Sequence, residues 1–141
     1  MTPSTSRPDF TGVWEMNLKR SLLRVPAPKR TLMKIAHREP RLIQQVLLTH
    51  AGGSEQRMTF TYETDAETIN SVGEFAVWTC ARWEGRELLI ESRMETPGRE
   101  VHLKDYWSLS DDGQTLSMAH RDDDLAGQIS VFEKSPNSAA F

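Results

Sequence analysis

The feature that most constrains this 141-residue chain is the spacing of its apolar side chains, which recur at every second position in several runs. The clearest runs are Trp14-Met16-Leu18, Met58-Phe60-Tyr62, Leu88-Ile90-Ser92-Met94 and Val101-Leu103-Asp105-Trp107-Leu109. This alternation is typical of β-strands that bury one face. Helical spacing extends over no more than a turn or two, so we expect little helix.

Turn signals separate these runs and set how neighbouring strands pair. A turn at Pro97-Gly98 and a four-residue loop over 111–114 predict the pairs Leu88–Trp107, Ile90–Asp105, Asp105–His120, Trp107–Met118 and Leu109–Leu116. A two-residue turn at Glu84-Gly85 predicts the pairs Ala81–Leu88, Thr79–Ile90 and Val77–Ser92. The three turns are independent, yet they place one mainly apolar face on the same side of four successive strands.

The first half of the chain follows the same rule. A turn at Glu39-Pro40 predicts the pairs Ile35–Gln44 and Met33–Val46, and a loop around Gly52-Gly53 predicts Leu48–Met58, Val46–Phe60 and Gln44–Tyr62. With Trp14 to Lys19 as the first strand and Ile129 to Lys134 as the last, we expect about eight to ten strands, enough for a barrel whose interior holds one small ligand.

These pairings predict an all-β fold, a single antiparallel up-and-down β-barrel with little helix. Closure protects the edges of so long a one-sided sheet. We expect a flexible N-terminal segment over residues 1–9, the barrel domain over 10–134 and a C-terminal tail over 135–141.

Composition excludes several classes of protein. The net charge is −3 and the one basic cluster, over residues 19–30, is broken by Leu and Pro, so we expect no nucleic-acid partner. No apolar run approaches the roughly 20 residues of a membrane span. The start of the chain lacks the apolar stretch of a signal peptide. This predicts a cytoplasmic protein as the sequence stands, or a secreted or periplasmic one if a leader was removed.

The opening of the first strand carries a resemblance to known proteins. Phe10-Thr11-Gly12-Val13-Trp14, Ser21, the segment Pro26-Ala27-Pro28-Lys29, the turn region Trp107 to Leu116 and Val131-Phe132-Glu133-Lys134 resemble a group of uncharacterised bacterial lipocalin-like proteins of the calycin superfamily. The resemblance implies a calycin barrel in which Trp14 plugs the closed end and Gly12 allows close approach. Pro26 and Pro28 interrupt the region where fatty-acid-binding proteins carry a helical lid, so we expect no such lid here.

The inward face also carries polar side chains. Asp105 falls between Leu103 and Trp107, where an unpaired carboxylate would be costly. The predicted register sets His120 directly opposite Asp105. The pair is either an acid–base pair or ligand anchor inside the barrel, or a structural or solvated pair near its rim.

We expect the ligand-binding residues to come from the rest of this face. They are Trp107, Tyr62, Gln44, Met33, Met58, Met94, Met118, Phe60, Ile90 and Thr79. Mostly apolar walls with a few convergent polar groups are typical of small-molecule pockets, although a filled core fits the same list. Four methionines suit a cavity that adapts its shape, and Met is also an ordinary gap-filler.

Other chemistry finds little support. The four histidines lack the spacing of a metal motif, and we expect His102 and His37 to be solvated. The acidic run Asp122-Asp123-Asp124 is most simply a solvated loop. Cys80 is the single cysteine, which excludes an intrachain disulfide. Motifs for a serine nucleophile, a phosphate loop or a dinucleotide are absent, so we expect no metal and no cofactor.

The sequence therefore favours a binding protein that holds a small, partly apolar molecule inside the barrel. The alternative is a cofactor-independent barrel enzyme, such as an isomerase, cyclase or lyase, that uses Asp105 and His120 for proton transfer. A third reading is a protein-binding module that uses the outer face. The oligomeric state stays open, a homodimer included.

Overall fold

A computed structural model describes residues 7–24, 26–121 and 127–136 of the chain. Ten strands form one antiparallel sheet in the order β4-β3-β2-β1-β10-β9-β8-β7-β6-β5. The strands are β1 (Gly12–Met16), β2 (Arg30–Arg38), β3 (Arg41–Thr49), β4 (Glu55–Glu63), β5 (Glu67–Val72), β6 (Phe75–Glu84), β7 (Glu87–Thr96), β8 (Arg99–Leu109), β9 (Thr115–His120) and β10 (Ile129–Ser135). No helix occurs in these described ranges, so the predicted all-β fold is confirmed.

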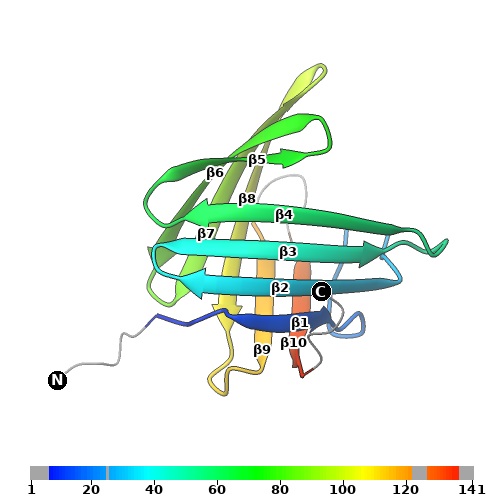
Figure 1. Cartoon of the computed structure of the whole chain (residues 1–141), viewed down its shortest axis with the longest axis vertical. Helices are drawn as coiled ribbons and strands as arrows, with labels where there is room; N and C mark the ends of the chain where they lie inside the picture. Colours follow the sequence, from blue (N-terminus) through cyan, green and yellow to red (C-terminus); the bar gives the residue numbers. More distant parts are fainter. Residues whose placement is uncertain (1–6, 25, 122–126, 137–141) are drawn as a thin grey trace.

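The sheet bends into a nearly closed barrel (Figure 1). Strands β2, β3 and β4 lie across the front of the view, and β7 to β10 cross behind them. The two outermost strands of the sheet, β4 and β5, follow each other in the chain. A bridge between Thr64 and Ala81 and side-chain hydrogen bonds from Thr68 and Asn70 to the backbone of Thr61 close this seam.

Most of the predicted pairings are present. The β2–β3 pairs include Ile35–Gln44, the β7–β8 pairs include Ile90–Asp105, and the β8–β9 pairs include Asp105–His120. Each of these three registers is the predicted one.

In two hairpins the pairing register is shifted by two residues from the predicted one. Ile90 pairs with Ala81 rather than Thr79, because the two-residue turn is Gly85-Arg86, with Gly85 at a φ of +64°. Met58 pairs with Val46 rather than Leu48, because the β3–β4 loop runs from residue 50 to 54. Side chains alternate with a period of two, so both shifts leave every residue on its predicted face.

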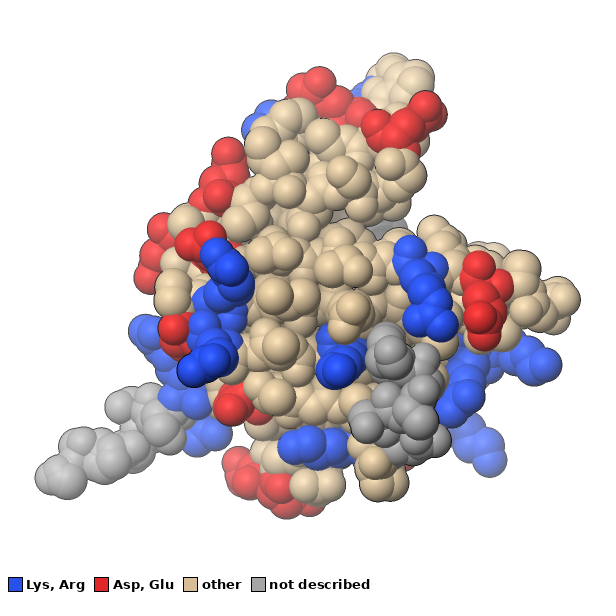
Figure 2. All heavy atoms as spheres, in the orientation of Figure 1, with Lys and Arg blue, Asp and Glu red and all other residues tan. Residues whose placement is uncertain are grey.

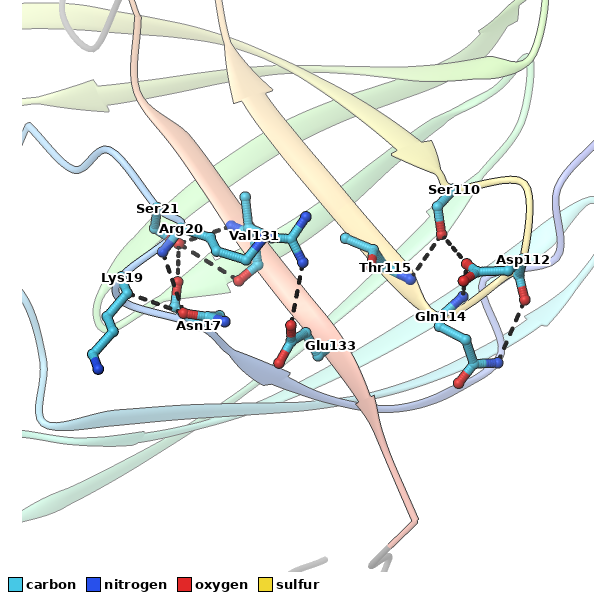
Figure 3. A network of polar contacts seen from close by, with 10 residues as sticks. All are labelled: Asn17, Lys19, Arg20, Ser21, Ser110, Asp112, Gln114, Thr115, Val131 and Glu133. Atoms are coloured by element: carbon cyan, nitrogen blue, oxygen red, sulfur yellow. Dashed lines mark hydrogen bonds and ion pairs between the residues drawn. The ribbon is translucent and has the colours of Figure 1, made fainter.

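Strand β1 is shorter than predicted and ends at Met16. Asn17 turns the chain: its side-chain oxygen accepts the amides of Lys19 and Arg20. Its carbonyl accepts the hydroxyl of Ser21, whose oxygen in turn accepts the amide of Val131 on β10 (Figure 3). Ser21 therefore ties the segment after β1 to the last strand, and no helical lid forms among the described residues of this segment.

One end of the barrel interior is filled by aromatic rings. Phe10 stacks on His37 and Trp83, with ring centroids 5.6 and 6.0 Å away, and meets the edge of Trp107 at 5.7 Å. His37 was predicted to be solvated, and that prediction is wrong: its side chain is 4% exposed. It lies on the inward face of β2 with Met33 and Ile35, so the alternation itself indicates burial.

The outer surface of β2 to β4 carries Lys and Arg side chains separated by other residues rather than gathered in a stripe (Figure 2). Among the described residues, no helix is long and apolar enough to cross a membrane. Most of the predicted terminal segments, and the run Asp122 to Asp124, lie outside the described part of the chain.

Candidate ligand-binding cavity

A cavity of about 260 Å³ lies between the inward faces of β3 to β8, with Met118 of β9 completing its wall. Five apolar side chains named from the sequence line it, and these are Phe60, Ile90, Met94, Trp107 and Met118. Four further apolar residues, not named as site residues, complete the apolar wall: Val72, Val77, Val101 and Leu103. The last three had inward positions in the predicted registers, so the signal for them was present.

Two methionines expected in the lining lie elsewhere. Met33 is 2% exposed and packs in the filled part of the core. Met58 is partly buried and packs against that core. Both face inward as predicted, but the cavity occupies only part of the interior, and neither side chain belongs to its lining.

Gln44 and Tyr62 form a buried polar chain in the wall. The Tyr62 hydroxyl donates to Oε1 of Gln44 at 2.9 Å. The Gln44 amide nitrogen donates to the sulfur of Met33 at 3.1 Å. Burial raises the pKa of Tyr62 far above its usual range, and the negative charge of Asp105 acts in the same direction. Tyr62 is therefore a neutral phenol at any physiological pH.

Smaller polar groups also line the cavity. Thr79 is 2% exposed and pairs with Ser92 on the neighbouring strand β7. The side-chain amide of Asn70 lies 3.5 Å from the Thr79 hydroxyl oxygen. Thr79 and Ser92 both belong to the cavity lining.

Asp105 and His120 are in contact through Oδ1 and Nδ1, as the predicted register required. The Asp105 side chain is 25% exposed and that of His120 is 16% exposed. Asp105 lines the cavity, whereas His120 does not belong to the lining. Any catalytic or binding role of the pair stays a prediction.

The β8–β9 turn sets the register that brings Asp105 and His120 together. Oδ1 of Asp112 accepts the Ser110 hydroxyl at 2.6 Å and the Gln114 amide at 3.0 Å. The Ser110 oxygen accepts the amide of Thr115 at 3.0 Å (Figure 3). The hydrogen bond from Ser110 holds the pKa of Asp112 below its usual value, helped by the Gln114 amide. These hydrogen bonds thus link the end of β8 to the start of β9 and fix the turn between them.

Metal binding gains no support from the site. In the part of the chain that the structure describes, no three His, Cys, Asp or Glu side chains gather as metal ligands would. His102, on the outer face of β8, is 64% exposed as predicted and contacts Glu100 at 2.6 Å.

Comparisons with known proteins bear on the fold. No protein-family model and no curated protein sequence matches the chain. Among solved structures, a secretory abundant heat soluble protein of Ramazzottius varieornatus, from a dimer sample, has a TM-score of 0.65 at 15% identity, covering 89% of this chain and 94% of its own. Secretory abundant heat soluble protein 4 of the same organism has a TM-score of 0.65 at 16% identity over 95% and 99% of the two chains. A point mutant of the fluorescent protein UnaG has a TM-score of 0.59 at 12% identity over 91% and 97%. These neighbours are lipocalin-like barrels. The chain has a calycin-like fold.

The opening residues of this calycin-like barrel occupy the positions that the resemblance implies. Trp14 is fully buried, and its indole nitrogen donates to the carbonyl of Phe10 at 2.9 Å. Gly12 has a φ of +151°, and a Cβ there would lie 2.9 Å from Cε of Lys134. Only glycine takes this backbone conformation without strain. The neighbours bear on the fold alone, so the bacterial source stays a prediction.

Proposed function

We propose that this protein binds a small, partly apolar molecule in the cavity between β3 and β9. The observation that carries the proposal is the cavity itself, whose apolar wall is interrupted by polar groups on Gln44, Tyr62 and Asp105. Mostly apolar pockets with a few placed polar groups are typical of small-molecule sites. The polar groups would orient the ligand and the apolar wall would supply most of the affinity.

The size of the cavity limits the ligand. Small-molecule pockets usually begin at about 300 Å³, and an apolar cavity of about 150 Å³ already holds benzene. A cavity of about 260 Å³ therefore suits a molecule of one or two rings, or a short chain of similar volume. Long fatty acids and large tetrapyrroles would need the barrel to expand.

The test uses 2-naphthalenemethanol as a probe, with calorimetry or ligand-detected NMR as the readout. Ser92 stands in the lining on β7, and Ser92→Phe fills the cavity while Ser92→Ala leaves it open. We expect Ser92→Phe to weaken binding by about tenfold or more, a change of about 1.4 kcal/mol, and Ser92→Ala to bind like the wild type. Absence of binding to the wild type, or equal binding by both variants, would overturn the proposal. Circular dichroism checks that each variant is folded.

A second candidate function follows from the contact between Asp105 and His120 at the cavity wall. A carboxylate that lines the cavity and rests on an imidazole is suited to move a proton to or from a bound molecule. In this case Asp105 would contact the substrate, and His120 would position the Asp105 carboxylate. An enzyme should lose about 10²-fold or more in turnover in Asp105→Asn, the usual scale for general acid–base catalysis, whereas a binder should lose only modest affinity.

A further inference from the structure

Among the described residues that line the cavity, a single side chain is charged, and its charge is negative. Asp105 is acidic, and among the described residues that line the cavity there is no Lys, Arg or His. A carboxylate ligand entering the cavity would therefore meet the Asp105 carboxylate and no cationic side chain in the lining. Like charges repel more strongly in a partly enclosed site than in bulk water, because the protein lowers the local dielectric.

Two hydrogen-bonding groups of the wall, on Tyr62 and Asp105, favour a ligand that donates hydrogen bonds. Tyr62 has one hydroxyl proton, and Gln44 accepts it at 2.9 Å. The Tyr62 oxygen can still accept a hydrogen bond from a ligand. One proton of the Gln44 amide is directed at the Met33 sulfur, 3.1 Å away in the core. Tyr62 and Asp105 thus offer acceptors to a bound molecule, while the hydroxyls of Thr79 and Ser92 can either donate or accept.

His120 does not change the negative character of the cavity wall. Its Nδ1 contacts Oδ1 of Asp105 from outside the lining. A protonated His120 would reduce the net charge of the pair, but of the two groups only the carboxylate lines the cavity. A carboxylate has two oxygens and about four acceptor positions, so contact with an imidazole and with a ligand donor are compatible.

We infer that the cavity takes a small aromatic or aliphatic molecule whose polar end is a protonated amine, and that it discriminates against carboxylates of the same shape. This inference rests on the proposed function, because it assigns a chemical class to the ligand of the same cavity. The amine would donate to Asp105 and to the oxygen of Tyr62, and its apolar body would lie against Ile90, Met94 and Trp107.

Three probes that share one apolar body test the inference. They are 2-naphthalenemethylamine, 2-naphthalenemethanol and 2-naphthoate, each titrated into the full chain at about pH 7, where the amine is protonated and the acid ionised. We expect the amine to bind about tenfold or more tightly than 2-naphthoate, a change of about 1.4 kcal/mol, with the alcohol between them. Binding of 2-naphthoate as tightly as the amine would overturn the inference while leaving the proposed function in place. Failure of all three probes would instead count against the proposed function.

Two variants assign the preference to Asp105. Asp105→Asn should remove the advantage of the amine over the alcohol. Glu91→Gln is the matched control, since Glu91 lies on the outer face of β7 and pairs with Arg82 and Lys104. It should leave the order of the probes unchanged. An amine preference that survives in folded Asp105→Asn would overturn the role of this carboxylate, and the comparison of probes in the wild type stands even if that variant does not fold.

Discussion

The side chain of Asn70 on β5 hydrogen-bonds to both backbone groups of Thr61 on β4. Its Oδ1 accepts the Thr61 amide at 2.8 Å, and its Nδ2 donates to the Thr61 carbonyl at 3.0 Å. The Thr68 hydroxyl donates to the same carbonyl at 2.9 Å. At this seam, where the sheet order ends, side chains supply hydrogen bonds that a neighbouring strand supplies elsewhere in the barrel.

We expect Asn70→Ala to lower the free energy of unfolding by about 1–3 kcal/mol, because it leaves a part-buried amide without its acceptor. Hydrogen exchange at the Thr61 amide should become faster than in the wild type. Thr59→Ala is the control, since Thr59 is an exposed residue of the same strand. Unchanged protection of Thr61 in Asn70→Ala would mean that the seam is held by other contacts.

The face on which each strand residue lies was predictable from the sequence, whereas the position or length of a turn was not always predictable. Pro97-Gly98 and the 111–114 loop set their registers correctly. At Gly85 the same kind of reasoning placed the turn one residue early, because glycine fits either position of a two-residue turn. The error had no effect on which side chains face inward, because the register shifted by two residues and a shift of two preserves the alternation.

The depth of a residue inside the barrel was not predictable. Met33 and Met94 share the inward face, yet Met33 is packed in the core and Met94 lines the cavity. Alternation gives the direction of a side chain and carries no information about its height along the barrel. The bonds of Asn70 across the seam depend on how the sheet curves and were likewise not predictable. The Asp105–His120 contact was, because a single short loop joins their strands.

Trp14 offers a test of the filled end of the barrel. Its side chain is fully buried and hydrogen-bonded to Phe10, so Trp14→Ala should cost about 3–5 kcal/mol of stability, the usual range for a buried Trp. Affinity for the naphthalene probes should change little in the fraction that stays folded, because Trp14 does not line the cavity. Chemical denaturation measures the first effect and calorimetry the second.

Trp78 provides the comparison for Trp14. It lies on β6 with the guanidinium of Arg93 4.8 Å from its ring centre. Trp78 is only partly buried, so Trp78→Ala should cost clearly less than Trp14→Ala, with about 1 kcal/mol coming from the lost cation–π contact. Equal losses in the two variants would contradict the plug role of Trp14.

Acid should weaken the end of the barrel where His37 is buried. Phe10 donates its amide to Nδ1 of His37 at 3.2 Å, so Nε2 carries the ring proton and donates it to Glu39 at 2.6 Å. Partial burial acts to raise the pKa of Glu39, but hydrogen bonds from His37 and Thr64 outweigh it and hold the pKa below 4.5, the ordinary value.

A lowered pKa in the folded state means that the ionised Glu39 stabilises the protein above pH 4.5 and that this contribution is lost as pH falls through the lowered pKa. Thermal unfolding of the wild type should therefore lose stability more steeply than Glu39→Gln between about pH 5 and pH 3. Parallel profiles for the two proteins would show that Glu39 contributes nothing to acid sensitivity.

The contact between Asp105 and His120 can be tested by a double-mutant cycle on Asp105→Asn and His120→Gln. The two side chains touch, and neither is fully exposed, so their effects on stability should be non-additive by about 0.5–3 kcal/mol, the range for residues in contact.

Binding of 2-naphthalenemethylamine gives the second readout of the same cycle. If the pair acts as one unit at the cavity wall, Asp105→Asn should weaken amine binding more than His120→Gln, because only Asp105 lines the cavity. The double variant should then be little weaker than Asp105→Asn alone. If the two substitutions are non-additive in stability but additive in amine affinity, the pair has only a structural role. If they are additive in both measurements, the contact contributes nothing to stability or to binding.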